Sequence, residues 1–154
     1  TEHLLRRTLG PGISLEVLPA AQDPFMRGDA GSLQRVLLNL ATNARDAMPL
    51  GGTVTISAAE EELAPDPTQP DLPAGRYVTL RVQDTGSGIP LRQQGRLFEP
   101  FYTTRHGQGG VGLGLWVVYW IVQAMGGWVR LESEPAHGTT FFLYFPALTP
   151  VPEE

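Results

Sequence analysis

Two residue types are missing from this chain of 154 residues: cysteine and lysine. The lack of cysteine excludes disulfide bonds, a thiolate zinc site, an iron–sulfur cluster and a cysteine nucleophile. All 11 basic residues are arginines, so Schiff-base chemistry and a Walker-type phosphate lysine are excluded as well. Apolar runs are short, and none reaches the roughly 18 residues that a membrane-spanning helix needs. We therefore expect no membrane contact by this domain.

Positive charge is sparse and scattered. The net charge is −5, and five of the 16 acidic residues lie between Glu60 and Asp71 with no basic residue among them. The arginines form no cluster that could follow a phosphate backbone, so nucleic acid is not an expected partner.

The patterning of apolar and polar residues predicts a mixture of helices and strands. Helices are expected at 1–9, from an N-cap at Asp29 to Met48, and at 113–125, the last apolar nearly all round and so mostly buried. Strands are expected at 13–18, 53–59, 76–83, 128–132 and 139–145, with a short one at 25–27. Four prolines between 64 and 74 exclude a helix or central strand there. The fold class expected is α+β, a two-layer sandwich in which helices cover one face of a mixed sheet.

Polar side chains recur along the second helix. Asn39, Asn43 and Asp46 lie at i, i+4 and i+7, so they share one stripe beside the apolar face. An amide oxygen suits a hard cation such as Mg²⁺. Solvated or capping asparagines would give the same pattern.

A carboxylate and two glycines follow the strand at 76–83, in the order Asp84-Thr-Gly86-Ser-Gly88-Ile89. The carboxylate can accept a hydrogen bond from an exocyclic amine, and glycines let the backbone approach a flat ring. An ordinary tight turn also uses these residues.

Eight of the 18 glycines lie between Gly86 and Gly114. The run 107–115 opens a helix and could present backbone N–H groups to a polyphosphate, or form a plain surface loop. Before it, the aromatic segment 97–105 resembles a hinged lid with Arg105 reaching a phosphate, and equally a loop that plugs a core.

The order Asn-x₃-Asn, Asp-x-Gly-x-Gly, Phe-x-x-Phe and Gly-x-Gly resembles the N, G1, F and G2 boxes of the catalytic, ATP-binding domain of sensor histidine kinases, of the nitrogen-regulation or hybrid-sensor type. The resemblance implies the Bergerat ATP-binding fold, with a mostly antiparallel sheet. It also implies that 1–10 is the end of a linker helix from a phosphoacceptor domain, 11–148 the catalytic domain and 149–154 a flexible tail.

The resemblance implies that the domain binds ATP and Mg²⁺. Asn43 would coordinate the metal and act in catalysis together with Arg105. The other implied nucleotide contacts are Asn39 and Asp46 beside the phosphates, Asp84 at the adenine amine, Gly86, Gly88 and Ile89 at the ring, Gly110, Gly112, Leu113, Gly114 and Leu115 in the lid and the helix after it, and Thr139 in a water network beside Asp84.

Related ATPases of this fold carry a water-activating glutamate where this chain has Asn39, which cannot act as a base. The resemblance therefore favours transfer of the γ-phosphate to a protein over hydrolysis. Neither His3, His106 nor His137 lies in an acceptor motif, so the expected partners are a separate histidine-containing dimerisation domain and, downstream, a response-regulator receiver domain. We expect a cytoplasmic domain, with membrane attachment of the full-length protein left open. The alternatives are a serine kinase of the anti-sigma type, a stand-alone ATPase and a non-catalytic nucleotide-sensing or docking module.

The sequence departs from the family pattern at Val111, Trp116 and Trp120, where smaller or hydroxyl-bearing residues are usual. Trp116 and Trp120 are four residues apart and should share one helix face. They could be buried under the lid aromatics Phe98, Phe101 and Tyr102, or form a docking patch for another domain.

Overall fold

The computed structural model describes residues 2–18, 30–68, 70–94 and 114–147. Helices and strands are mixed along the chain. In order they are α1 (Glu2–Leu9), β1 (Ile13–Leu18), α2 (Ala30–Ala47), β2 (Gly52–Leu63), β3 (Gly75–Asp84), α3 (Leu91–Gln94), α4 (Gly114–Ala124), β4 (Trp128–Ser133) and β5 (Thr139–Pro146).

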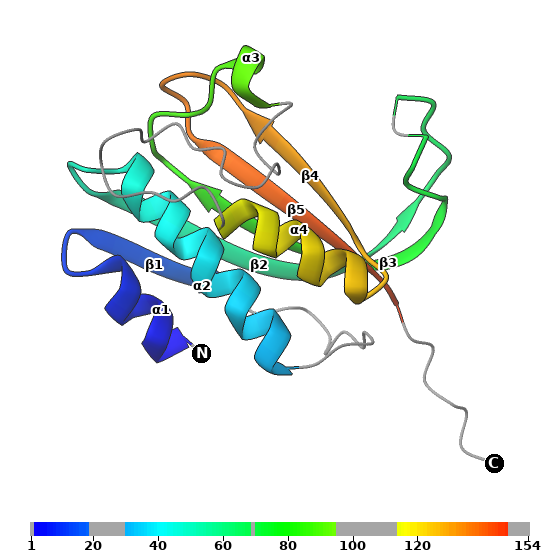
Figure 1. Ribbon diagram of the computed structural model, residues 1–154, viewed down its shortest axis with the longest axis horizontal. Coiled ribbons are helices and arrows are strands. Elements are labelled where there is room, and N and C mark those ends of the chain that lie inside the picture. The colour runs from blue at the N-terminus through cyan, green and yellow to red at the C-terminus, as the bar shows by residue number, and fades with distance from the viewer. Residues whose placement is uncertain (1, 19–29, 69, 95–113, 148–154) are drawn as a thin grey trace.

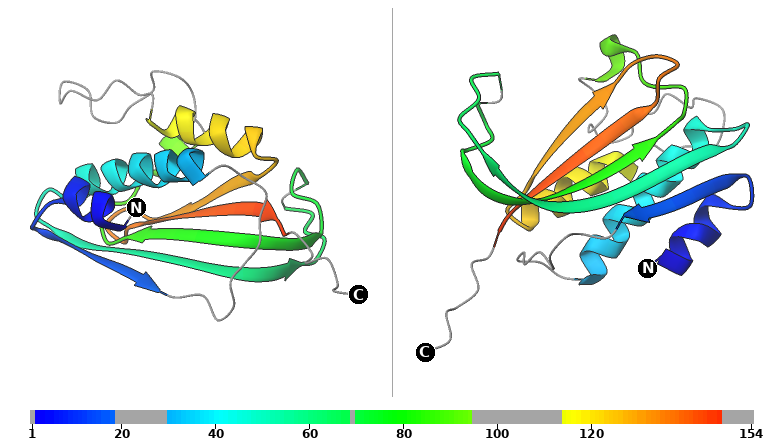
Figure 2. Two further views of the ribbon diagram at one scale, coloured as in Figure 1. Left: turned by 90° about the horizontal axis from the view of Figure 1, so that it is seen from below. Right: turned by 180° about the vertical axis from the view of Figure 1, so that it is seen from behind.

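The strands form one five-stranded sheet in the order β1-β2-β3-β5-β4 (Figure 1). β1 runs parallel to β2, whereas the other neighbouring pairs are antiparallel. Helices α1, α2 and α4 lie on the same face of the sheet, as the edge-on view in Figure 2 shows. The predicted α+β sandwich with a mixed, mostly antiparallel sheet is therefore confirmed.

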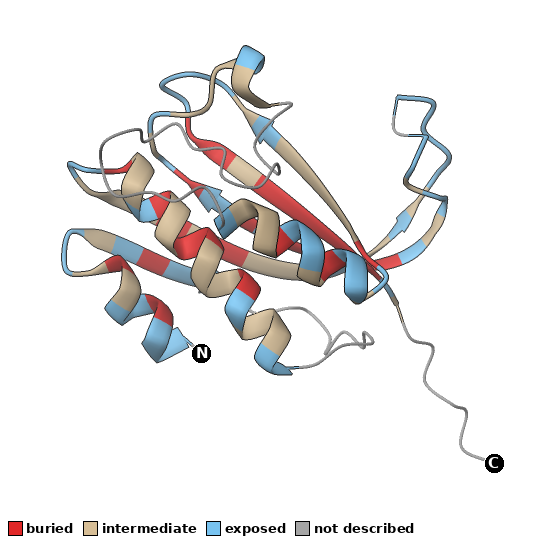
Figure 3. Cartoon of the chain, in the orientation of Figure 1, coloured by how far each residue is buried: buried red, intermediate tan, exposed pale blue. Residues whose placement is uncertain are grey.

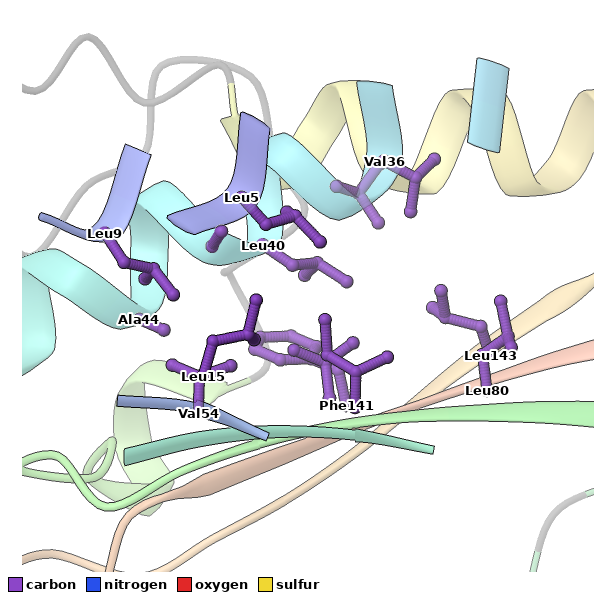
Figure 4. Close-up of a cluster of buried hydrophobic side chains, with 14 of the residues drawn as sticks. Leu5, Leu9, Leu15, Val36, Leu40, Ala44, Val54, Leu80, Phe141 and Leu143 are labelled. Atoms are coloured by element: carbon purple, nitrogen blue, oxygen red, sulfur yellow. The ribbon is translucent and has the colours of Figure 1, made fainter. Parts of the chain in front are cut away.

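The main core lies between these helices and the inner face of the sheet. Figure 4 shows Leu5 and Leu9 of α1, Val36, Leu40 and Ala44 of α2, and strand residues such as Phe141 converging there. The α2 residues are spaced four apart, so they form one stripe, and each is at most 2% exposed. The assignment of α1 to a linker stays a prediction, but its two leucines belong to this core, and Arg45 Nη1 donates to the Thr8 carbonyl at 3.0 Å.

The outer face of the sheet carries a second cluster, made of the buried rings of Tyr77, Phe142 and Tyr144. Leu72, from the proline-rich loop between β2 and β3, packs on these rings, and the Tyr77 hydroxyl donates to the Pro73 carbonyl at 2.6 Å. That loop has no helix or strand in its described residues, as its prolines predict.

Strand β2 is longer than the sequence predicts. It continues past Ala59 to Leu63 and stays paired with β3 as far as Gly75. The alternation of apolar and polar residues stops at Glu60 because the strand leaves the helix-covered core there. Two ion pairs, Glu60 with Arg76 and Glu61 with Arg81, join the two strands in this extension.

The prediction that the helix at 113–125 is mostly buried is wrong. In α4 only Val118 and Val122 are buried, whereas Tyr119 is 42% and Trp120 is 59% exposed (Figure 3). Only one side of α4 faces the core, so the helix has more apolar residues than the core can bury. Trp116 and Trp120 do share a face, with ring centroids 6.2 Å apart in an edge-on arrangement. Their expected cover, Phe98, Phe101 and Tyr102, lies outside the described residues.

The short strand expected at 25–27 and the N-cap at Asp29 also lie outside the described residues. Helix α3 was not expected, because four residues are too few for a periodic pattern. In the described part of the chain, no helix is long and apolar enough to cross a membrane.

Candidate functional site

The centre of the candidate site is Asp84, the last residue of β3. Its side chain is only 4% exposed. The carboxylate oxygen Oδ1 accepts a hydrogen bond from the Gly86 N–H at 2.8 Å, and the backbone N–H of Thr139 donates to the carboxylate as well. Asp84 lies directly opposite Thr139 in the β3–β5 pairing, so their side chains lie on the same face of the sheet.

Burial raises the pKa of the Asp84 carboxyl above its ordinary value, and this effect outweighs the two backbone N–H groups, which lower it. A carboxylate held in this way is costly to the empty protein because its charge is taken out of water. A ligand that donates a hydrogen bond would compensate the ionised form. The site is therefore matched to a donor group such as an exocyclic amine.

The turn after β3 packs against the C-terminal end of α2. The Ser87 N–H donates to the Ala47 carbonyl at 3.1 Å. Gly86 has no space for a side chain, since a Cβ there would lie 2.7 Å from the Ala47 oxygen and 2.9 Å from Asp84 Oδ1. Glycine at this position therefore lets helix, turn and carboxylate meet.

The polar stripe of α2 leads to this same junction. Asn43 lies one helical turn before Ala47, and Asn39 lies one turn before Asn43. Both asparagines and Asp46 are half-buried, at the border of the core. Neither asparagine amide has a hydrogen-bond partner within the described part of the chain, whereas Asp46 lies 3.6 Å from Arg45 Nε. Binding of a ligand by these amides stays a prediction.

The turn between β4 and β5 closes the other side of the site. The Ala136 N–H donates to the Ser87 carbonyl at 2.6 Å. Gly88 adopts a φ of +73°, and a Cβ there would overlap the Glu134 carbonyl. Gly138 adopts a φ of +83° and packs in the same way on the Asp84 carbonyl. The turn after β3 and the β4–β5 turn, which are distant in sequence, therefore pack closely against each other because glycines stand at the points of contact.

Two residues of this junction were missed by sequence reasoning. Ser133 Oγ accepts from the Ile89 N–H at 2.8 Å and lies 2.8 Å from Thr139 Oγ1. Gln94 Nε2 donates to the carbonyls of Ile89, at 2.9 Å, and Ser133, at 3.2 Å. Ser133 belongs to the segment 126–146, which also resembles the C-terminal hairpin of the sensor histidine kinase domain, and that resemblance was a usable signal. No sequence signal distinguishes the half-buried Gln94 from any other glutamine.

The structure thus brings together Asp84, Gly86, Gly88, Ile89 and Thr139, with the α2 stripe beside them. Gly114, predicted in the lid region, is the exposed first residue of α4, and Leu115 is half-buried against the main core. Their contact with a nucleotide stays a prediction. The remaining predicted site residues, Arg105, Gly110, Gly112 and Leu113, lie outside the described residues. Among the described residues, no three His, Asp or Glu side chains gather as a metal site.

Comparison with known proteins agrees with this arrangement. Residues 28–149 match the family described as histidine kinase-, DNA gyrase B- and HSP90-like ATPase. The chain therefore belongs to this family and is an ATP-binding domain. Its motif order, read from the sequence, indicated the sensor histidine kinase branch.

Curated relatives support that branch. The chain is 40% identical over 148 residues to the sensor kinase CckA of Brucella abortus and 38% identical over 145 residues to the sensor protein DivL of Caulobacter vibrioides. Each alignment covers 94% of this chain but only 16% and 17% of the relative. The chain thus spans about a sixth of the length of these relatives.

Solved structures show the same fold. The mycobacterial sensor histidine kinase MprB superimposes with a TM-score of 0.68 at 28% identity, covering 95% of this chain and 88% of that one. Full-length ShkA, solved in complex with AMPPNP, gives a TM-score of 0.70 at 29% identity over 98% of this chain and 31% of that one. These matches confirm the predicted class: the chain is the catalytic, ATP-binding part of a sensor histidine kinase.

Substituting Gly88 with alanine is expected to weaken ATP binding by at least about fivefold. The substitution forces a side chain into a left-handed backbone conformation, which costs about 1–3 kcal/mol, and into the Glu134 carbonyl. Calorimetric titration with ATP measures the effect. Gly12→Ala is the matched control, because a Cβ at Gly12 meets nothing within 4 Å. Parent-like affinity in Gly88→Ala would show that the turn does not shape the site.

Proposed function

We propose that this domain binds Mg·ATP between α2 and the turn after β3, and transfers the γ-phosphate to a histidine of a phosphoacceptor domain outside this chain. Asp84 accepts a hydrogen bond from the adenine amino group. Gly86, Gly88 and Ile89 lie against the ring, and Thr139 holds water beside it.

One observation carries the proposal: a buried carboxylate at the end of a strand lies beside the end of the helix that carries the half-buried amide stripe, next to a turn that has no space for side chains at Gly86 and Gly88. The carboxylate suits the amine of a base. The amides suit the Mg²⁺-bound triphosphate of the ligand, because their neutral oxygens bind a hard cation without adding negative charge near the phosphates.

Within this proposal, Asn43 binds Mg²⁺ together with the phosphate oxygens, and Asn39 and Asp46 lie beside them. A Mg²⁺ ion held mainly by phosphates needs few protein ligands. In the transfer step, the acceptor histidine nitrogen forms a bond to the γ-phosphorus, the bond to the bridging oxygen breaks and ADP leaves. Such a reaction needs positioning and charge stabilisation, so amides, a metal ion and Arg105 suffice. Asn39 cannot activate water, so hydrolysis is slow.

The proposed partners follow from the acceptor chemistry. The immediate partner is a histidine-containing dimerisation domain, and the phosphoryl group then passes to a response-regulator receiver domain. We place the domain in the cytoplasm, where ATP and receiver domains are available.

The proposal predicts that the purified chain alone does not phosphorylate itself. Incubation with γ-labelled ATP is expected to leave it unlabelled, and to label an added histidine-containing helical hairpin domain from a sensor kinase. The label should be acid-labile, and absent when the acceptor histidine is replaced by alanine. Rapid labelling of His3, His106 or His137, or an unlabelled acceptor in the presence of bound ATP, would contradict it.

A further inference from the structure

Ser133, the last residue of β4, lies where three segments of the site cross. Its Oγ is 2.8 Å from the Ile89 nitrogen, 3.0 Å from the Gly138 carbonyl oxygen and 2.8 Å from Thr139 Oγ1. The turn after β3, the β4–β5 turn and the first residue of β5 therefore meet at one hydroxyl group.

The number of protons at this junction determines the direction of each hydrogen bond. A serine hydroxyl has one proton and two lone pairs. The Ile89 N–H donates to one lone pair, and the Gly138 carbonyl can only accept, so the Ser133 proton is directed to Gly138. The contact with Thr139 is then a hydrogen bond only if the Thr139 hydroxyl donates it. All three contacts are satisfied by this single arrangement.

This arrangement sets the polarity of the pocket wall. The Thr139 proton is engaged by Ser133, so its hydroxyl offers only lone pairs to anything else. Asp84, paired directly opposite on the same face of the sheet, is also an acceptor when ionised. Both side chains are only 4% exposed, so water competes weakly. The wall then accepts hydrogen bonds and donates none from these side chains.

We propose that Ser133 is a positioning residue for base discrimination: by accepting the Thr139 proton it keeps this wall free of donors and so selects a 6-amino purine over a 6-oxo purine. An amino group donates to such a wall, directly or through water, whereas a carbonyl oxygen meets lone pairs. The inference rests on the proposed binding of adenine beside Asp84.

The test compares the dissociation constants for ATP and GTP in the parent chain, Ser133→Ala, Thr139→Val and the double variant. In Ser133→Ala the Thr139 hydroxyl is free to turn and donate to a 6-oxo group. The ratio of the GTP constant to the ATP constant is expected to fall by at least about threefold, the value of one hydrogen bond. In the double variant this ratio should fall no further than in Thr139→Val alone, because Ser133 acts through Thr139.

A merely structural role gives a different result. Ser133→Ala also leaves the Ile89 N–H without its acceptor, and a loosened loop would weaken ATP and GTP by the same factor. An unchanged ratio in a folded Ser133→Ala variant therefore overturns the proposal. Thr139→Val keeps the hydrogen bond from the Ile89 N–H to Ser133, so it tests the proposal if Ser133→Ala does not fold. An unchanged ratio of the GTP to the ATP dissociation constant in Thr139→Val also overturns the proposal. A parent chain that binds no ATP would overturn the proposed function itself, and this inference with it.

Discussion

Replacing Asp84 with asparagine is expected to weaken ATP binding by about 10- to 150-fold while the fold is retained. The substitution exchanges a charged acceptor for an amide that donates as well as accepts. A hydrogen bond to a charged group contributes about 1.5–3 kcal/mol, which gives this range of affinity. Isothermal titration with ATP measures the loss, and an unchanged dissociation constant would exclude the adenine assignment.

A matched control separates this loss from a general effect of charge. Asp71→Asn removes one carboxylate from the exposed loop on the outer face of the sheet and should leave ATP affinity unchanged. A comparable loss in Asp71→Asn would mean that net charge rather than the site determines affinity.

Asp84→Asn should weaken ATP binding but should not lower the stability of the nucleotide-free protein. Burial raises the pKa of Asp84, so above that pKa the ionised carboxyl makes the empty folded state less stable. Asp84→Asn without nucleotide is therefore expected to unfold at the same or a higher temperature than the parent at pH 7. As pH falls through the raised pKa toward 3.8, the parent binds its proton in the folded state and this difference should disappear.

Replacing Asn43 with alanine is expected to abolish the Mg²⁺-dependent part of ATP affinity and to lower phosphoryl transfer by at least about 100-fold. Stabilisation of transition-state charge by a bound metal contributes several kcal/mol, and its loss would give an effect of this size. The helix should persist, because alanine is the best helix former and the Asn43 amide has no partner in the described part of the chain. Titrations with and without Mg²⁺, and acceptor labelling, measure the two effects.

The control for Asn43→Ala is Gln34→Ala, a half-buried amide nearer the start of the same helix. It should bind Mg·ATP as the parent does. If Mg²⁺ raises ATP affinity equally in Asn43→Ala and in the parent, the ion is held by other groups.

Sequence reasoning located most of the fold because each prediction depended on a local pattern. The stripe of Val36, Leu40 and Ala44 marks α2, and the four prolines at 64–74 mark the loop. The predictions from sequence were wrong where the pattern of residues does not show how far the core extends. Glu60, Glu61 and Glu62 break the apolar alternation in the extension of β2 because this part of the strand projects past the helices, and α4 exposes Trp120 because only one side of the helix faces the core.

The sequence by itself determined which chemistry is available: no thiol, no lysine, and a carboxylate, two amides and glycines in an order typical of one family. Tertiary structure alone decided which of these groups meet. Asp84 lies opposite Thr139, Ser87 contacts Ala47, and Ser133 joins two turns to β5. Such contacts depend on strand order and register between distant segments, which alternation of apolar residues along one strand does not specify. The proton arrangement around Ser133 arises only when those segments pack together.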